Sequence, residues 1–373
     1  MNVIFTCGGT GGHINPAIAV ANLLRERRPE TKILFVGAED GMENKLVPMA
    51  GYELETLKIS NFQRRMTPAG LWHNVVTAAH IAGSLKKAGR LIDRFQPDII
   101  IGTGGYASFP TLKMGTRKKI PTLVHESNAV PGLATRLVAD GVDRIMVSFP
   151  ESRSRYRHPE RVVVTGTPVR SEFIFTTRAA ARRELGLDDR PLVVSYWGSL
   201  GAREMNKVIA RFMALESEQD AFYHIHATGS FGWRWMPDFV REQGVDLAAH
   251  PNIRMQEYIH NMPTVMAAAD LVICRAGAST ISEVEAAAAP CIMVPSPNVT
   301  EHHQERNAEV LAQRGMALVL PEAECSGQRL YETVAELLAH PERLETMRKA
   351  QQRGAVLDSA ERIYQLVLEL AKK

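Results

Sequence analysis

Short apolar runs alternate with longer amphipathic stretches along the whole chain. Runs of this length are typical of buried strands, whereas the stretches between them have helical periodicity. Alternation of the two predicts a parallel sheet covered by helices. In four places an apolar run leads directly into a glycine- or alanine-glycine turn: 3–6 into 8–12, 98–101 into 102–105, 192–195 into 198–201, and 271–274 into 276–279.

Two of these strand–turn units precede residue 167 and two follow it. This predicts two similar doubly wound α/β domains, in which ligands bind beyond the carboxyl ends of the strands. Gly166 and Pro168 mark the crossover, so we expect domains at 1–167 and 168–355. The tail predicts helices near 342–352 and 358–371, which either close the second domain or cross back onto the first.

Composition fits two folded domains and excludes several other classes. The 373 residues are 45% hydrophobic and 23% charged, so a disordered chain is excluded. No apolar run reaches 18 residues, and the start reads as a strand rather than a signal peptide. The four cysteines are isolated, which predicts a reducing, cytoplasmic compartment and neither zinc nor structural disulfides.

The net charge of +3 is unevenly distributed. Residues 1–167 hold 22 Lys and Arg against 14 Asp and Glu, while the remainder holds 22 against 27. A basic first half predicts an anionic partner there, such as a phosphate, a membrane surface or a nucleic acid, although solvated basic faces are also common.

The first glycine turn predicts an anion site. Four glycines in positions 8–12 let backbone N–H groups approach an anion, and the turn opens a helix for which Asn15 and Pro16 provide a cap and a first residue. It is not a Walker A loop, because His13 stands where lysine would be. His13 is either a general base or a ligand of loop backbone.

The second turn formally fits the dinucleotide fingerprint GxGxxG/A, with Glu126 near the expected distance. The fingerprint belongs on a domain's first strand, which disfavours a nicotinamide cofactor. Glu126 and Asn128 follow another strand and either bind a polar acceptor group or cap their loop. In the second half, Ser199 can add a hydroxyl to a phosphate site.

Two further segments carry polar groups suited to a nucleotide sugar. Thr280 and Glu283 have the spacing of a capping box, or Glu283 accepts hydrogen bonds from ribose hydroxyls. Gln304 and Asn307 lie three residues apart and can face one ligand. The nearby pair His302 and His303 does not have metal-ligand spacing, so no metal is predicted.

Residues 64–90 form an apolar and basic stretch. Leu71, Trp72, Val75 and Val76 start a predicted helix, and the basic residues around it include Lys86 and Lys87. This composition suits docking on an anionic membrane face, and equally a helix that packs on the core.

Together the motifs resemble the MurG family, the UDP-GlcNAc-dependent transferases of peptidoglycan synthesis. They occur in the family's order over almost the full length: GGTGGH, GTGGYASFP, HESNAVPG, GTPVR, GSLGA, RAGASTISE and HHQERNA. The sequence departs from the family at Trp197 and Phe109, where glycine is usual, and at His303, where some members have glutamine. A paralogue with another acceptor is therefore an alternative.

The resemblance implies the GT-B fold, with two Rossmann-like domains across a cleft and a C-terminal helix, about 356–373, on the first. It implies inverting transfer of GlcNAc, without a metal or other cofactor, from UDP-GlcNAc to the C4 hydroxyl of the MurNAc of lipid I. It implies a peripheral location on the cytoplasmic side of the plasma membrane and no nucleic acid. The first domain would serve the acceptor and the membrane, and the second UDP-GlcNAc.

The same resemblance assigns residues. His13 is the expected base, and Gly104, Gly105, Tyr106 and Glu126 are expected on the acceptor side. The donor set is Thr10, Gly11, Gly12, Asn128, Arg170, Ser199, Ile259, Ala278, Ser279, Thr280, Ile281, Ser282, Glu283 and Gln304. Competing functions are another GT-B UDP-sugar transferase with a lipid or small-molecule acceptor, a UDP-GlcNAc epimerase, and a nucleotide-binding scaffold without activity.

Overall fold

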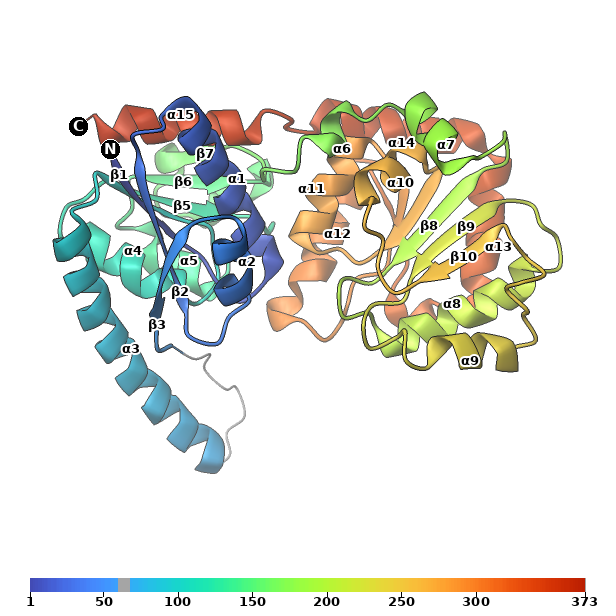
Figure 1. Cartoon of the computed structure of the whole chain (residues 1–373), viewed down its shortest axis with the longest axis horizontal. Helices are drawn as coiled ribbons and strands as arrows, with labels where there is room; N and C mark the ends of the chain where they lie inside the picture. The colour runs from blue at the N-terminus through green and yellow to red at the C-terminus, as the bar shows by residue number, and fades with distance from the viewer. Residues whose placement is uncertain (60–67, 373) are drawn as a thin grey trace. The chain divides into compact units, whose positions relative to one another are not determined.

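The computed structural model describes residues 1–59 and 68–372, without the side chains of 68–76, 78–79 and 300. The chain forms two compact units (Figure 1). Unit 1 comprises Met1–Val169 and Val356–Lys373, and unit 2 comprises Arg170–Ala355. The boundary thus falls two residues beyond the expected residue 167.

Unit 1 is built on a seven-stranded, fully parallel sheet with the strand order β3-β2-β1-β4-β5-β6-β7. Its strands are β1 Asn2–Thr6, β2 Lys32–Ala38, β3 Glu53–Leu57, β4 Ile99–Gly102, β5 Thr122–Glu126, β6 Arg144–Val147 and β7 Val162–Val164. Its helices are α1 Gly11–Arg27, α2 Glu43–Met49, α3 Pro68–Phe95, α4 Ser108–Arg117, α5 Leu133–Ala139 and α15 Ser359–Ala371, with short 3-10 turns at Pro150–Arg155 and Pro159–Arg161.

Alternation along the strands gives this sheet two buried faces. Val3 and Phe5 of β1 join one core with α1, α2 and α15, whereas Ile4 joins the other core with α3, α4 and α5. Side chains of successive strand residues point to opposite faces, so an uninterrupted apolar strand needs helices on both sides. The sheet is therefore a rigid platform for the loops at its edges.

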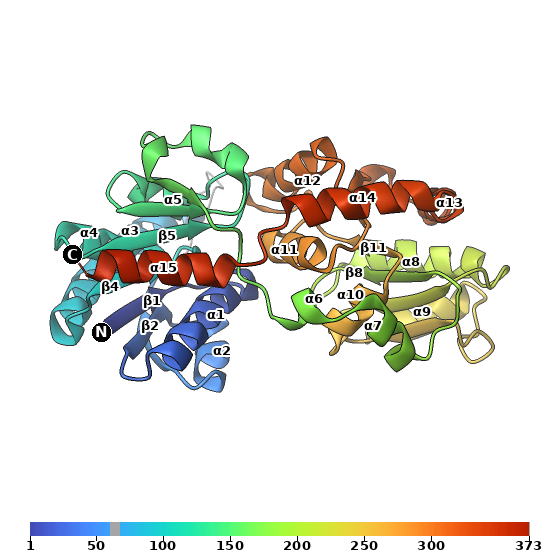
Figure 2. The same ribbon diagram turned by 90° about the horizontal axis from the view of Figure 1, so that it is seen from above.

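The C-terminal helix α15 packs on α1, as Figure 2 shows. Its side chains Ile363, Tyr364, Val367 and Leu370 are buried in the first core. Arg27 of α1 forms an ion pair with Glu361, at 2.6 Å. The last element of the chain therefore completes the unit that the first element began.

Unit 2 is built on a six-stranded parallel sheet with the order β10-β9-β8-β11-β12-β13. Its strands are β8 Leu192–Tyr196, β9 Tyr223–Ala227, β10 Ile253–Gln256, β11 Leu271–Cys274, β12 Cys291–Met293 and β13 Leu318–Val319. Its helices are α6 Glu172–Phe175, α7 Arg178–Leu185, α8 Arg203–Glu216, α9 Met236–Glu242, α10 Met262–Ala268, α11 Ala278–Ala287, α12 His303–Gln313, α13 Gly327–Ala339 and α14 Pro341–Gly354, with 3-10 turns at Thr300–His302 and Glu322–Glu324.

The core of unit 2 joins β8, β11 and β12 to α8, α9 and α13. The expected fold class, two Rossmann-like doubly wound α/β domains, is confirmed. In each sheet the strand order reverses beside the first strand, between β1 and β4 in unit 1 and between β8 and β11 in unit 2. Ligands of doubly wound sheets bind at this switch point. All four turns singled out in the sequence follow one of these four strands.

Candidate functional site

The turn after β1 enters α1 earlier than the sequence predicts. The helix starts at Gly11, with Thr10 as its N-cap residue, because the N–H groups of His13 and Ile14 donate to the Thr10 carbonyl. The expectation that Asn15 caps the helix and Pro16 begins it is wrong. Pro16 lies inside the helix, in its second turn, and because proline has no N–H it cannot donate to the carbonyl of Gly12, four residues back. The first-turn N–H groups of α1 therefore belong to the glycine motif itself.

The glycines of this turn differ in whether the fold requires them. A Cβ on Gly8 would lie 2.6 Å from the Glu43 carboxyl and 2.7 Å from the Ala107 methyl, and Gly9 has φ +90°. Packing and conformation thus account for both. Gly11 has ordinary dihedral angles, and a Cβ there would meet nothing nearer than 3.7 Å. The fold therefore does not require glycine at this position, and the space beside Gly11 leaves room for a ligand.

The turn after β4 packs directly against the turn after β1. Gly104 has φ +101°, and a Cβ there would lie 2.6 Å from Nδ1 of His13. Gly105 has φ +80°, and a Cβ would lie 2.2 Å from the Gly8 carbonyl oxygen. These two glycines, expected on the acceptor side, are therefore required for the contact between the two turns.

His13 is oriented by this contact. Its Nδ1 lies 3.1 Å from the carbonyl oxygen of Thr103, and the Thr103 hydroxyl donates to the His13 carbonyl at 2.6 Å. Because a carbonyl only accepts, Nδ1 carries the proton of the neutral ring and Nε2 carries the lone pair. A ring in this tautomer can accept a proton at Nε2, as a general base must.

Glu126 is engaged within its own loop. Its Oε1 accepts from the backbone N–H and side-chain amide of Asn128, at 3.1 and 3.0 Å, and its Oε2 accepts from the N–H of Gly132 at 2.9 Å. This geometry favours loop capping for Glu126 and orients Asn128. Tyr106, in the turn after β4, is half-buried, and burial together with Glu43 and Asp40 raises the pKa of its hydroxyl.

In unit 2 the turn after β8 is exposed at Ser199 and tightly packed at Gly201. A Cβ on Gly201, where φ is +79°, would lie 2.1 Å from the Thr228 carbonyl oxygen. Trp197 is 5% exposed, and the Arg275 guanidinium lies 5.5 Å from its ring centroid. This contact joins the turns after β8 and β11.

Helix α11 starts at Ala278, directly after the turn that follows β11, with Gly277 as its N-cap residue. Thr280 is therefore inside the first turn and does not cap the helix, so the capping-box interpretation is wrong. The first-turn N–H groups of Ala278, Ser279 and Thr280 have no intrahelical acceptor. A Cβ on Gly277 would meet nothing nearer than 3.9 Å, so this glycine also leaves room for a ligand.

Glu283 lies on the next turn of α11, beyond Ile281 and Ser282. Within the part of the chain that the structure describes, no hydrogen bond engages its carboxylate. Burial raises the pKa of Glu283 to about 7, and the positive charge of Arg170 opposes that shift. Arg170 is exposed, and its guanidinium lies 5.2 Å from the Phe173 ring centroid. A carboxylate held in this way is available to polar groups of a ligand.

The remaining donor candidates differ in what they can offer. The side chain of Ile259 is 2% exposed, so only its backbone can reach a ligand. Gln304 lies in the first turn of α12, and its Oε1 accepts from the N–H of Ser296 at 2.9 Å, which fixes the orientation of the amide. His302 pairs with Glu305 at 3.1 Å. No group of three or more His, Cys, Asp or Glu side chains that could hold a metal occurs among the described residues.

Two charged residues that hold these turns are not among the expected site residues. Arg275 pairs with Glu322 at 2.5 Å and donates to the Val294 carbonyl at 3.0 Å. Glu43 is fully buried and accepts from the N–H of Gly9. A charged residue directly before a glycine turn was the available signal for Arg275, whereas the sequence offers no comparable signal for Glu43.

The expected membrane segment lies on α3 and is described only in part. Lys86 and Lys87 are exposed. The side chains of Leu71, Trp72, Val75 and Val76 lie outside those that the structure describes. Within residues 1–59 and 68–372, none of the helices combines the length and apolarity that a bilayer crossing requires.

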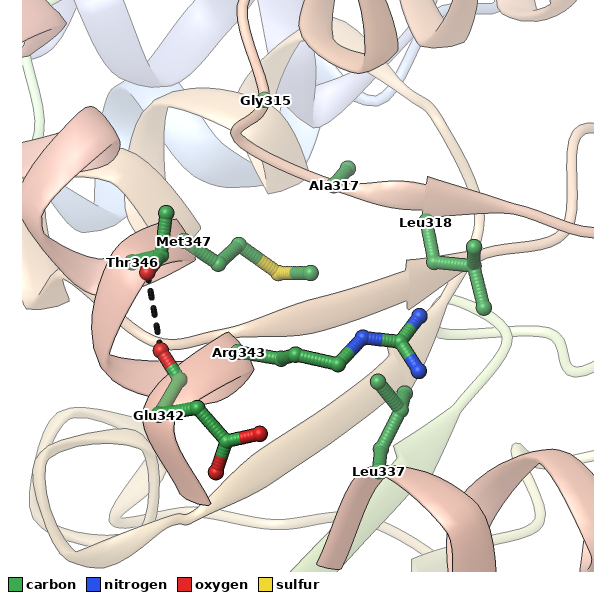
Figure 3. A pocket seen from close by; sticks show the side chains of 8 residues that line it. All are labelled: Gly315, Ala317, Leu318, Leu337, Glu342, Arg343, Thr346 and Met347. Atoms are coloured by element: carbon green, nitrogen blue, oxygen red, sulfur yellow. Dashed lines mark hydrogen bonds between the residues drawn. The ribbon is translucent and has the colours of Figure 1, made fainter. Parts of the chain in front are cut away.

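A pocket of about 290 Å³ occurs elsewhere in unit 2, beside β13, α13 and α14 (Figure 3). Ala317, Leu318, Leu337 and Met347 give it apolar walls, and Arg343 extends among them. Gly315 and Ala317 precede β13, so the pocket lies at the amino end of that strand. It contains none of the expected site residues and is separate from the turns at the switch point.

Comparison with known proteins shows to which class of proteins this chain belongs. Residues 3–147 match the glycosyltransferase family 28 N-terminal domain, and residues 193–363 match the glycosyltransferase family 28 C-terminal domain. Together these matches cover most of both units. The chain is thus a glycosyltransferase with the two domains of family 28.

Relatives that match over their full length show to which family of glycosyltransferases the chain belongs. The chain is 39% identical, over 100% of its length and 99% of the relative's, to the UDP-N-acetylglucosamine--N-acetylmuramyl-(pentapeptide) pyrophosphoryl-undecaprenol N-acetylglucosamine transferase of Acetivibrio thermocellus. A protein of the same name from Halalkalibacterium halodurans is 36% identical over the full length of both chains. The crystal structure of Acinetobacter baumannii MurG shares the fold, with a TM-score of 0.77 at 24% identity over 99% of both chains. The chain belongs to the MurG family.

Proposed function

We propose that this protein transfers GlcNAc from UDP-GlcNAc to the C4 hydroxyl of the MurNAc of lipid I, forming lipid II for peptidoglycan. The observation that carries the proposal is full-length similarity, at 39% identity, to transferases of that name. The geometry supports it, because both sheets present helix N-termini, with glycines that the fold does not require, at their switch points.

Unit 2 is the proposed donor site. The N–H groups of Ala278, Ser279 and Thr280 and the hydroxyl of Ser199 would hold the diphosphate, since a helix N-terminus favours negative charge. The Glu283 carboxylate would accept hydrogen bonds from the ribose hydroxyls. Gln304, oriented by Ser296, would bind GlcNAc hydroxyls. The backbone of Ile259 would contact the remainder of the nucleotide, and Arg170 would face the leaving diphosphate.

Unit 1 is the proposed acceptor site. The resemblance assigns Thr10, Gly11 and Gly12 to the donor. Because they lie at the start of α1 in unit 1, we propose instead that they bind the pyrophosphate of lipid I. Asn128, oriented by Glu126, and Tyr106 would line the same edge of the sheet. His13 would take the proton of the attacking hydroxyl at Nε2, because Thr103 holds the proton on Nδ1.

The proposed reaction is one displacement at the anomeric carbon. The hydroxyl oxygen forms the new bond as the bond to the UDP oxygen breaks, so the anomeric configuration inverts. Charge builds on the leaving diphosphate, and the fixed N–H donors of α11 together with Arg170 would stabilise it. No step calls for a metal or another cofactor, since these donors supply the positive potential.

The protein would act at the cytoplasmic face of the plasma membrane, where its lipid acceptor resides. The basic surface of α3, with Lys86 and Lys87, is the proposed contact with anionic headgroups. The apolar residues Leu71, Trp72, Val75 and Val76 at the start of that helix would add apolar area to the contact.

The proposal is tested by incubating the protein with labelled UDP-GlcNAc and a short-chain lipid I analogue, with and without EDTA. We expect a β-1,4-linked disaccharide product at equal rates in both. His13→Ala should lower kcat by a factor on the order of 10² to 10⁴, the usual contribution of a general base, while UDP binding stays unchanged.

Three outcomes would contradict the proposal. Conversion of UDP-GlcNAc without the acceptor would identify an epimerase. Preference for UDP-glucose or UDP-galactose, or for a different acceptor, would identify another GT-B transferase. Loss of turnover in EDTA that Mg²⁺ restores would remove the proposed role of the α11 donors and Arg170.

A further inference from the structure

A buried carboxylate lies beneath the glycine turn after β1. Glu43, the first residue of α2, has an exposed fraction of 0%. No ion pair engages it among the described residues. A buried charge without a cation needs hydrogen bonds to its oxygens, and the structure provides them from the backbone.

The two carboxylate oxygens bind different strand ends. Oε1 accepts from the N–H of Ala38, the last residue of β2, at 2.7 Å, and Oε2 accepts from the N–H of Gly9 at 3.1 Å. Hydrogen bonds to an ionised acceptor are roughly twice as strong as neutral ones. Glu43 therefore ties the turn after β1 to the end of the neighbouring strand.

Three glycines from three segments make room for this side chain. A Cβ on Gly8, Gly37 or Gly41 would lie 2.6, 2.4 or 2.1 Å, respectively, from atoms of the Glu43 side chain. Asn44 holds the same segment from the other side, donating to the carbonyls of Ala38 and Gly41 at 2.8 and 3.0 Å. In the turn after β1, Gly8 is therefore needed to make room for the Glu43 carboxylate, and not for a ligand.

This arrangement decides which N–H groups of the turn remain for a ligand. Gly9 donates inward to Glu43, and His13 donates to the Thr10 carbonyl. The first-turn N–H groups of Gly11 and Gly12 have no intrahelical acceptor. An anion is therefore directed to the start of α1 and away from Gly9, where it would also meet the negative charge of Glu43.

We propose that Glu43 is a positioning residue, which fixes the turn after β1 so that Gly11 and Gly12, but not Gly9, bind the pyrophosphate of the acceptor. This inference rests on the proposed function. A carboxylate that only stabilised the fold would affect the binding of both substrates. The proposed role of Glu43 affects the affinity for the acceptor only.

The wild-type protein provides the first test, by residue-resolved amide hydrogen exchange with the short-chain lipid I analogue and with inorganic pyrophosphate. Both ligands should protect the amides of Gly11 and Gly12 and leave Gly9, already bonded, unchanged. Protection of Gly9 by either ligand, or no protection of Gly11 and Gly12, would overturn the inference.

The variant Glu43→Gln provides the second test, since its amide places an NH₂ group against one of the two N–H donors. The KM for the lipid I analogue should rise at least about tenfold, as expected for a lost hydrogen bond to a charged group, with an unchanged KM for UDP-GlcNAc. The matched control is Asp98→Asn, because Asp98 accepts the N–H of Asn2, at 2.7 Å, at the other end of the same strand. It should leave both KM values unchanged.

Equal rises of both KM values in Glu43→Gln, or no rise, would overturn the inference. Amide exchange measured without ligand tests the role of Glu43 independently of the proposed function. If the wild type makes no product, the proposed function fails, yet Glu43→Gln should still accelerate exchange at Gly9. Unchanged exchange at Gly9 would refute the role of Glu43 itself.

Discussion

At the scale of single residues, the structure separates glycines and carboxylates that look alike in the sequence. Gly8 and Gly105 allow two turns to pack, whereas Gly11 and Gly277 leave space at helix starts. Glu126 caps its own loop, whereas Glu283 has no internal hydrogen-bond donor among the described residues. Residue type alone singled out all of these positions, and only three-dimensional contacts could show which of them the packing of the fold requires.

Glu283 should make donor binding depend on pH. Its pKa is raised to about 7, so the group is largely protonated below pH 7 and ionised above it. The ionised form accepts two hydrogen bonds from a diol, so the KM for UDP-GlcNAc should fall as the pH rises from 6 to 8. Glu283→Gln should raise that KM roughly 10- to 100-fold and abolish its change with pH.

Glu285→Gln is the control on the same helix, because residues two positions apart do not share a helix face. It should leave the KM and its pH profile unchanged. If Glu283→Gln instead lowers the melting temperature and leaves the donor KM as it was, the residue serves only the helix.

At the scale of elements, alternation of apolar runs and amphipathic stretches sufficed to predict the parallel sheets and the four turns at their edges. Helix starts were less predictable. Pro16 and the Thr280–Glu283 spacing both indicated starts several residues too late, because glycine and small residues upstream adopted helical conformation. Local capping rules fail there, since the N-terminal turns of α1 and α11 are set by packing of the preceding loop.

Helix α15 should stabilise unit 1 specifically. Ile363 is 1% exposed in the core that α15 shares with α1 and β1. Ile363→Ala should lower the free energy of unfolding of unit 1 by about 2–5 kcal/mol, through lost burial and the cavity left behind. Calorimetry or denaturant unfolding monitored separately for each unit measures this, and the transition of unit 2 should not move.

Leu357→Ala is a control in the same tail, since Leu357 is 47% exposed. Exposed substitutions of this kind usually change stability by less than 0.5 kcal/mol. An Ile363→Ala variant as stable as this control would show that α15 contributes little to unit 1.

At the scale of the whole molecule, the order of the motifs predicted the family, and the full-length relatives confirm it. The sequence also showed that the excess of positive charge lies in residues 1–167. Charge counting could not show which basic residues pair with an acidic neighbour, as the exposed Lys118 does with Asp93 at 2.6 Å.

This charge distribution predicts binding to vesicles that contain anionic phospholipid, weakening as salt is raised because exposed charges are screened. Each lysine near such a surface contributes about 1 kcal/mol, so Lys86→Glu with Lys87→Glu should lower the vesicle partition coefficient at least about tenfold. Co-sedimentation measures this partition coefficient.

The control is Arg241→Glu with Lys349→Glu, on exposed positions of unit 2, which changes the net charge equally and should have little effect. Equal losses in both pairs would point to net charge rather than the α3 surface.

The return of α15 to unit 1 has a consequence for synthesis on the ribosome. Unit 2 is continuous in sequence, from Arg170 to Ala355, whereas unit 1 lacks part of its core until Val356–Lys373 has been made. During translation the second unit can therefore reach its native state before the first is complete. Until α15 has been synthesised, the nascent first unit exposes the apolar surface that this helix will cover.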